Sequence, residues 1–397
     1  MTEYEAAPWV PWRNHQSKLV LGILSVSLLS LSFLTTGCGS SHEKSKLKEQ
    51  WNHHNDPLNF LPADFERVFK TLPLSATLEK QPWSDSYWPS YLGGIALRWN
   101  TASNYYDDSF RYRALPFWRL RRMAPEILAQ LSPAEKFDIL NADYSYTLLR
   151  MERMRTSPAS PTWEGLCHGW ATAALNFEEP KAVVVTNPDG IAIPFGSADI
   201  KALLDIYAGN FGNSREYYVA QRCNVELARH PEAAVSPACR DTNAGTFHLV
   251  LANQIGIRHE GFVADLTRDF QVWNQPIFGF ESMVVSESDG ASPGAAPGTV
   301  HEVTLQTKMN YVGEAGANWA HGFTHTPDRI YNYRLELNEA GQIIGGAWLD
   351  EARPDFLWRK EKPEFIDVGA LRFSSLKSLY EASIQAPADA PNPVWRQ

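Results

Sequence analysis

The chain of 397 residues lacks an excess of positive charge, because its formal net charge is −9 at pH 7. A broad nucleic-acid-binding surface is therefore not expected, since such a surface needs clustered Lys and Arg. The sequence also lacks an internal repeat and an EF-hand loop. Apolar residues are not scarce: 44% of the chain is hydrophobic, with 14 Trp, 15 Tyr and 19 Phe. This composition suffices for one or two packed cores and argues against bulk disorder.

The N-terminal hydrophobic run is too short for an ordinary membrane span. It covers residues 19–34, follows Arg13 and Lys18, and ends at small residues before Cys38. Such a run is typical of a signal-peptide core. The ending resembles a bacterial lipoprotein signal with Cys38 as the acylated residue, although the usual leucine stands one place early, at Leu34. We therefore expect residues 1–38 to be a signal peptide with a lipoprotein-type cysteine. A plain cleaved signal or a membrane anchor is the alternative, and each predicts an exported chain.

Cysteine is rare, with four residues in the whole chain. Cys38 is assigned to lipid, and Cys223 and Cys239 flank a Pro-containing loop. In an oxidising compartment a disulfide between this pair is the natural use. A metal site on the pair needs two more ligands, and only His230 lies between them. Cys167 is then the candidate reactive thiol.

Composition divides the exported chain into four parts. Residues 39–56 are polar and indicate a tether from membrane to domain. Residues 57–161 are aromatic-rich and helical, with the capping-box spacing Ser132 to Glu135. Residues 162–385 alternate helix and strand and form the expected catalytic domain, and residues 386–397 form a loose Ala/Pro-rich tail. The fold class predicted is α+β.

Within 162–385 the expected elements follow from apolar periodicity and turn residues. They are helices from Cys167 and from Ser197, strands at 182–185, 247–253 and 261–264, an exposed loop at 286–300, and a hairpin pairing 331–337 with 343–348.

The chemistry-bearing residues occur in the order Cys167, His248, Asp265. Cys167 begins a Gly-flanked helix, whose N-terminal N–H groups favour a thiolate and lower the thiol pKa. His248 is expected on a strand and Asp265 at the end of the next, as a base and the acid that orients it. Asp269 and Asn274 are alternative orienting groups. The competing interpretation is a buried cysteine and a satisfied core histidine, which are common in folded proteins.

Two segments carry a resemblance to a known family. They are Trp-Glu-Gly-Leu-Cys-His-Gly-Trp-Ala at 163–171 and Val-Trp-Asn-Gln-Pro-Ile-Phe-Gly-Phe at 272–280. The chain resembles the transglutaminase elicitor family, the secreted Phytophthora cell-wall transglutaminases and their bacterial relatives. The second segment is similar to the family's surface peptide recognised by plants and departs from it at Ile277 and Phe278. Weaker likeness runs from about Trp83 to Trp358.

The resemblance implies a papain-like or transglutaminase-like thiol acyltransferase core. It implies Cys167 as nucleophile, His248 as base and Asp265 as orienting acid in a protein-glutamine γ-glutamyltransferase. Such an enzyme joins a protein glutamine to a lysine amine by an isopeptide bond, or deamidates the glutamine when water attacks. The resemblance also allows calcium as a cofactor. The alternatives are a cysteine peptidase or amidase on the same site, and a non-catalytic surface module of the same fold.

An oxyanion hole needs a second N–H donor beside the Cys167 amide. Papain-like enzymes use a glutamine a few residues before the cysteine, but the nearest upstream glutamine here is the distant Gln130. Trp163 Nε1 is a candidate donor, and the candidate pocket residues are Trp163, Trp170, Trp273 and Asn274. His321 and His325 have the spacing of two helical metal ligands but lack the Glu of a zinc peptidase. No metal site is therefore predicted.

Overall fold

The computed structural model describes residues 52–99, 109–227, 229–236, 239, 241–268, 270–317 and 322–387. The predicted signal peptide, Cys38 and most of the predicted tether lie outside these residues, as do Asp269 and His321. The chain divides into two compact units, Met1–Leu47 and Lys48–Gln397, and the description below concerns the second. Among the described residues, no helix is both long enough and apolar enough to cross a membrane.

The main sheet is antiparallel in every strand pair. Its order is β4-β10-β5-β6-β7-β8-β9, with β1 also paired to β6. The strands are β1 Ser75–Thr77, β4 Glu216–Val219, β5 Phe262–Asp265, β6 Asn274–Asp289, β7 His301–Tyr311, β8 Asp328–Leu337, β9 Ile343–Trp348 and β10 Leu357–Lys360. A separate two-stranded sheet pairs β2 Val183–Thr186 with β3 Ala192–Phe195.

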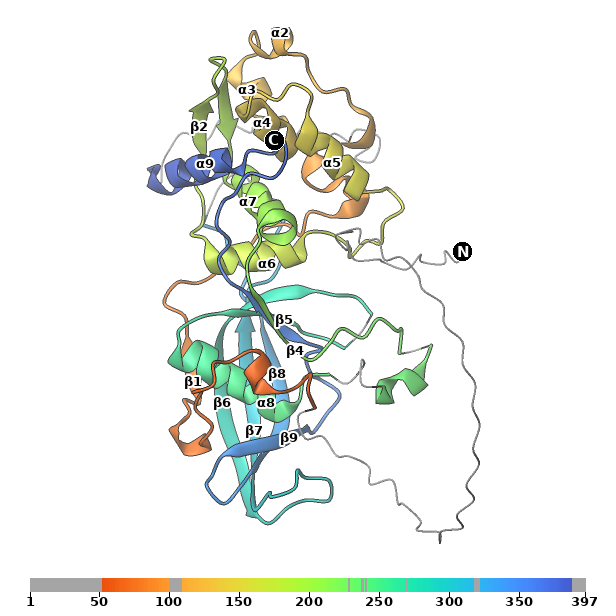
Figure 1. Ribbon diagram of the computed structural model, residues 1–397, viewed down its shortest axis with the longest axis vertical. Helices are drawn as coiled ribbons and strands as arrows, with labels where there is room; N and C mark the ends of the chain where they lie inside the picture. Colours follow the sequence, from red (N-terminus) through yellow and green to blue (C-terminus); the bar gives the residue numbers. More distant parts are fainter. Residues whose placement is uncertain are drawn as a thin grey trace, which may run out of the picture. The chain divides into compact units, whose positions relative to one another are not determined.

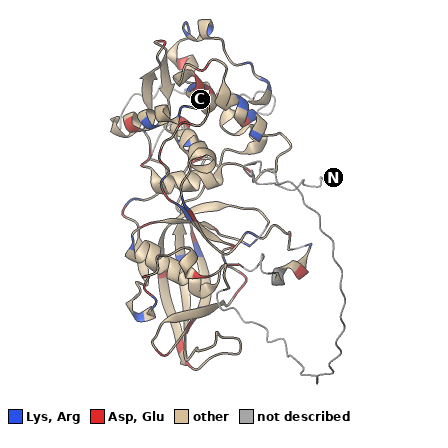
Figure 2. Cartoon of the chain, viewed as in Figure 1, with Lys and Arg blue, Asp and Glu red and all other residues tan. Residues whose placement is uncertain are grey.

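Most of the helices lie above the main sheet as Figure 1 draws it, whereas the helix Ala244–Val250 lies against the strands of the sheet. The helices are α2 Phe117–Leu120, α3 Pro125–Leu128, α4 Pro133–Leu140, α5 Thr147–Arg155, α6 Cys167–Asn176, α7 Ser197–Ile206, α8 Ala244–Val250 and α9 Phe373–Gln385. Short helical turns occur at Pro57–Asn59, Phe69–Thr71, Ser90–Leu92, Gly94–Ala96 and Pro231–Val235, and π-helical turns at Tyr207–Phe211 and Leu251–Ile257 extend α7 and α8. Figure 2 shows both signs of charge on the helices and on the strands.

Two hydrophobic cores meet at α6. The first packs α4, α5, α7 and α9 together and includes Trp170, whereas the second packs α8 against the main sheet and includes Ala171. The sequence-based division at residue 161 does not separate these cores, because Leu148 and Trp170 both lie in the first. The last residues of the predicted tether also belong to the folded unit, since Asn55 is 4% exposed and donates to the Asp241 carbonyl.

Several expected elements are present with small shifts in their ends. The capping box of α4 is formed, with Ser132 Oγ accepting from the Glu135 N–H at 3.2 Å. The late hairpin is formed by β8 and β9, and Gly341 adopts a φ of 71° in its turn. The loop expected at 286–300 is shorter, because β6 continues to Asp289 and β7 begins at His301.

The strand predicted at 247–253 is wrong, because this segment is helical. Asn243 caps α8 by accepting from the N–H groups of Gly245 and Thr246 at 2.9 and 3.4 Å. All seven residues of α8 are buried. A short segment that is buried on every face shows no clear two-residue or 3.6-residue period, so periodicity cannot separate strand from helix there.

Candidate functional site

Cys167 is the first residue of α6, as the sequence predicted. Its thiol is free and the residue is 5% exposed. The preceding segment is held by the Leu166 N–H, which donates to the Tyr87 carbonyl at 2.6 Å. A Cβ at Gly165 would overlap the Tyr87 carbonyl oxygen, and one at Gly169 would overlap the Asp205 carbonyl oxygen. Both glycines therefore permit the close backbone approach that fixes the start of α6.

Asn274 presents an amide donor to the thiol. It is the first residue of β6, and its Nδ2 lies 3.5 Å from Cys167 Sγ. Its Oδ1 accepts from the indole N–H of Trp358 at 2.8 Å. Because an indole N–H only donates, this bond fixes which end of the amide faces the sulfur. The sequence had placed Asn274 only loosely, as a pocket residue or an alternative orienting group.

Asp265 also lies at the site. It is the last residue of β5, fully buried, and directly opposite Asn274 in the β5–β6 ladder. Its Oδ1 is 3.5 Å from the Trp273 N–H. The strand end therefore places an acidic side chain where its charge acts on the thiol.

The electrostatic environment of Cys167 differs from the expectation. Burial raises the pKa of the thiol, hydrogen-bonding groups of Asn274 lower it, and the carboxylates of Glu314 and Asp265 raise it further. Glu314 follows β7, and burial raises its own pKa while Gln275 Nε2 donates to it at 2.7 Å. Burial and the two carboxylates therefore oppose ionisation of the thiol, while the donors of Asn274 favour it.

His248 does not lie at this site, and the predicted pairing with Asp265 is wrong. Its Nδ1 is 2.8 Å from Tyr333 Oη, which in turn is 2.7 Å from Thr307 Oγ1. Thr307 Oγ1 shares a hydrogen bond with Ser282 Oγ at 2.8 Å. Ser282 stands eight positions after Asn274 on β6, roughly 26 Å along a straight strand. His248 therefore serves the second core rather than Cys167.

The burial of His248 is complete. Its ring also lies against Phe69, with ring centres 5.9 Å apart, and burial lowers the pKa of His248 to about 3. His248 is thus a core histidine, the alternative expected from the sequence, but only Nδ1 is paired: its buried Nε2 has no hydrogen-bond partner among the described residues.

Two further histidines, His168 and His325, make other contacts, although the charge of His325 acts on Glu314. The ring of His168 lies against Gly209, and burial lowers its pKa to about 4. The His325 ring lies against Gly313, and the backbone N–H of His325 donates to Ser84 Oγ at 2.8 Å. Within the described part of the chain, no histidine ring is hydrogen-bonded to Cys167 Sγ. Of the three predicted residues, Cys167 and Asp265 therefore lie at one site, and His248 lies at another.

The three tryptophans proposed for a pocket have different places. Trp170 is fully buried in the first core, and its indole N–H donates to the Trp83 carbonyl at 3.0 Å, so it cannot line a substrate pocket. Trp163 is partly buried and meets Phe270 edge-on, with ring centres 6.0 Å apart. Trp273 is partly buried and meets Tyr87 at 5.3 Å. Trp163 and Trp273 therefore keep partly open faces near the thiol.

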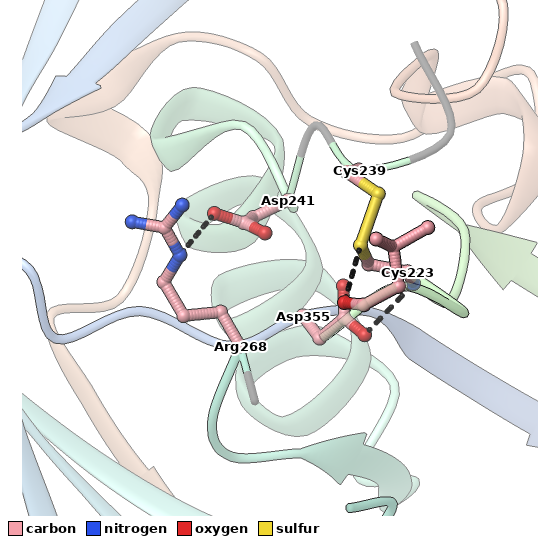
Figure 3. Close-up of a disulfide and its surroundings, with 6 residues drawn as sticks. Cys223, Cys239, Asp241, Arg268 and Asp355 are labelled. Atoms are coloured by element: carbon pink, nitrogen blue, oxygen red, sulfur yellow. Dashed lines mark hydrogen bonds and ion pairs between the residues drawn. A yellow bond between two sulfur atoms is a disulfide. The ribbon is translucent and has the colours of Figure 1, made fainter. Parts of the chain in front are cut away.

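The predicted disulfide between Cys223 and Cys239 is present, with Cα atoms 4.4 Å apart. Figure 3 shows it beside Asp355, whose Oδ2 accepts from the Cys223 N–H at 3.3 Å. Asp355 itself donates its N–H to the Asp265 carbonyl at 3.0 Å. The disulfide is therefore connected to the Cys167 site through two backbone contacts.

Metal ligands are not grouped in the described residues: no set of three or more His, Cys, Asp or Glu side chains there is arranged to hold an ion. The donor set needed for calcium, several oxygen ligands around one point, is thus not assembled by the described carboxylates. His321, half of the weak His-x-x-x-His pattern, lies outside the described residues.

The fold and site define a mixed helical and antiparallel-sheet protein in which a helix N-terminus presents a thiol to an asparagine and an aspartate on adjoining strands. The chain belongs to the transglutaminase elicitor family, whose model matches residues 58–386. A search of curated proteins found no match.

The crystal structure of the GP42 transglutaminase from Phytophthora sojae is similar to this structure, with a TM-score of 0.62 and 21% sequence identity. The match covers 84% of this chain and 99% of that chain. At this identity the likeness concerns the fold. The segment 272–280, similar to a surface peptide of the family, is buried here from Asn274 onward.

Proposed function

We propose that this protein is an exported protein-glutamine γ-glutamyltransferase that acts through a thioester on Cys167. The observation that carries the proposal is the amide of Asn274, fixed by Trp358 with its N–H donors toward a thiol at a helix N-terminus. An acyl-transfer site needs this pairing of nucleophile and N–H donor. A nucleophile helix packed on antiparallel strands that supply its partners supports placing the core with the papain-like thiol enzymes.

The chemical steps follow from that pairing. Cys167 Sγ attacks the γ-carboxamide carbon of a protein glutamine, and the oxygen takes the negative charge. Asn274 Nδ2 and the backbone N–H of Cys167 are the proposed donors to that oxygen. The proton removed from the Cys167 thiol passes to the leaving nitrogen. The C–N bond then breaks, ammonia leaves, and a thioester remains. A lysine amine then attacks the thioester to form an isopeptide bond and release the thiol.

The mechanism requires a proton acceptor beside Cys167, because burial raises the pKa of its thiol. Asp265 and Glu314 are carboxylates whose charges act on the thiol. Substitution of each by its amide, together with His321→Gln and His325→Gln, assigns the acceptor. The acceptor is the residue whose substitution removes the pH dependence of the Cys167 alkylation rate near neutrality. His248→Gln is the matched control, since His248 lies in the other core.

We further propose that the protein is exported and held to a membrane by lipid on Cys38. The disulfide supports this, because disulfides persist in oxidising compartments. Cys38→Ser provides the test: the wild-type chain should fractionate with membranes and the variant should not. A variant that remains in the membrane fraction would indicate an uncleaved anchor instead.

The decisive assay follows incorporation of a fluorescent primary amine into a glutamine-rich protein, with ammonia release measured in parallel. It uses the purified full-length chain in detergent, with Cys167→Ala and Cys167→Ser as controls, in added calcium and in chelator. Incorporation that disappears in both variants is expected. A difference between calcium and chelator would assign a cofactor role to the ion.

The other results separate the competing functions. Ammonia release without amine incorporation would indicate deamidation, and cleavage of the protein substrate would indicate a peptidase. No signal from a folded protein whose Cys167 also resists iodoacetamide would overturn the enzymatic proposal in favour of a non-catalytic surface module.

A further inference from the structure

Arg222 is held beside the segment that leads to Cys167. Its guanidinium carbon lies 5.7 Å from the ring centre of Trp163, which precedes the thiol by four positions. Its Nη2 donates to the Phe270 carbonyl at 3.5 Å, and Phe270 packs on the same Trp163. These two contacts, from different segments, hold the partly buried guanidinium beside the segment that precedes Cys167. The proposed mechanism does not use this cation.

The ionisable groups that act on Cys167 come from several elements, and most are acidic. Asp265 ends β5 and Glu314 follows β7, and both disfavour a thiolate. Burial lowers the pKa of Arg222, and its interactions with Asp265, Asp355 and Cys167 act in the opposite direction. The groups facing Cys167 or Arg222 in this way are Tyr87, Asp265, Glu314 and Asp355. Arg222 is the cation placed among them.

The disulfide fixes the backbone on which Arg222 stands. Cys223 directly follows Arg222, is 2% exposed, and is joined to the equally buried Cys239. Its N–H donates to Asp355, as Figure 3 shows, and Asp355 donates to the Asp265 carbonyl. Arg222 directly precedes this closed loop, so the disulfide and these bonds hold its backbone in place.

We propose that Arg222 is a positioning residue whose guanidinium stabilises the thiolate of Cys167, and that the Cys223–Cys239 disulfide holds it there. The proposal rests on the proposed role of Cys167 as the nucleophile. A nearby opposite charge favours the ionised form of a titratable group, whereas the two carboxylates oppose it. The cation thus makes a buried thiol ionisable at the moment when the base removes its proton.

The test measures the rate at which iodoacetamide alkylates Cys167 between pH 5 and 10, followed by mass spectrometry of the Cys167 peptide. Only the thiolate reacts, so the rate reports ionisation without any acyl donor. The full-length chain is compared with Arg222→Gln, Arg222→Met and Arg222→Lys. Arg215→Gln is the matched control. Arg215 also lies over an aromatic ring, that of Tyr217, but it is exposed and directly precedes β4.

Loss of the charge should move the midpoint of the alkylation curve upward by about one pH unit, or slow alkylation at pH 7 about tenfold. Arg222→Lys should shift it less, and Arg215→Gln should leave it unchanged. If Arg222→Gln does not fold, Arg222→Met is used in its place, because Met keeps the packing on Trp163. A folded, uncharged variant with an unchanged or lower midpoint would overturn the proposal.

The disulfide is tested by replacing both Cys223 and Cys239 with Ser. This variant should shift the midpoint in the same direction, and adding Arg222→Gln to it should produce no further shift. Full additivity of the two shifts would overturn the anchoring role. Because alkylation needs no glutamine substrate, a shift without amine incorporation would support Arg222 while rejecting the transglutaminase activity, and the reverse result would do the opposite.

Discussion

Asn274 and Ser282 are buried polar residues at different places along strand β6, and their surroundings differ. At Asn274 the neighbours are a thiol, a buried carboxylate and partly exposed aromatic rings. At Ser282 the neighbours are two hydroxyls and the ring of His248, all enclosed by the second core. The first place combines a nucleophile with a directed donor, while the second is a buried chain of hydroxyls that ends on Nδ1 of His248. Chemistry is therefore expected only at the Asn274 end.

The largest effect that this comparison predicts follows Asn274→Ala. Removal of an oxyanion donor should lower kcat for amine incorporation about 100- to 1000-fold, or about 3–4 kcal/mol of transition-state stabilisation. KM should change much less, because the donor acts on charge that develops during the reaction. Asn332→Ala is the control, since Asn332 bonds Asp350 on exposed surface. A kcat within twofold of the wild type would contradict the role of Asn274.

The buried polar chain at Ser282, near the middle of β6, should respond in stability alone. His248→Gln should lower the free energy of unfolding by about 1–3 kcal/mol in urea titrations, because Tyr333 loses a buried partner. Alkylation of Cys167 should not change. Loss of alkylation in a folded variant would restore His248 to the active site and contradict the comparison.

The pH dependence of that stability has a defined sign. The pKa of His248 in the folded protein, about 3, lies below the ordinary value of 6.5. The neutral ring therefore contributes stability above about pH 6.5 that is lost as the pH falls toward 3. The wild type should lose more stability on acidification than His248→Gln.

The buried carboxyl groups of Asp85 and Asp205 extend the comparison between reactive and structural polar groups. Burial raises the pKa of Asp85 to about 6, and burial together with Asp85 raises the pKa of Asp205. A raised carboxyl pKa gives stability that is fully present below about pH 4 and is lost as the pH rises through the folded-state value. Asp205→Asn should reduce this loss by about 1 kcal/mol or more between pH 4 and 7.

The control for this prediction is Asp189→Asn, because Asp189 is exposed and its carboxylate accepts from the Tyr144 hydroxyl at 2.6 Å. Thermal unfolding across the same pH range measures both variants. An unchanged slope in Asp205→Asn would show that the pair is ionised throughout and stabilised by Lys201.

The smallest expected effect follows Trp358→Phe. The variant keeps an aromatic ring but removes the N–H that orients Asn274, so kcat should fall about fivefold, near 1 kcal/mol. Trp348→Phe is the matched control at the other end of the sheet, where the indole N–H donates to the Thr242 carbonyl at 2.7 Å. Equal losses of kcat in both variants would mean that general destabilisation, not amide orientation, is measured.

Much of the local structure could be predicted from the sequence. The capping box of α4, the helix that begins at Cys167, the hairpin of β8 and β9 and the Cys223–Cys239 disulfide all depend on residues close together in the chain. The segment 163–171 with 272–280 also indicated the family to which the chain belongs. Short-range rules suffice for such features because caps, turns and small loops close over few residues.

The site itself was only partly predictable. His248 was assigned to a strand because a segment buried on all sides has no periodicity that separates strand from helix. Trp170 was assigned to a pocket although it fills the first core. Asn274 was named, yet nothing in its neighbours indicated that Trp358, far along the chain, fixes its amide.

The sequence by itself determined a free thiol at a Gly-flanked helix N-terminus, the paired cysteines and the family. Only the tertiary structure decided which polar groups reach that thiol. Asn274 contacts Cys167, and the charges of Asp265, Glu314 and Arg222 interact with it, although all four residues are distant from Cys167 in sequence. Burial and the charges of these groups then set the ionisation of the thiol, and those quantities exist only once the chain has folded.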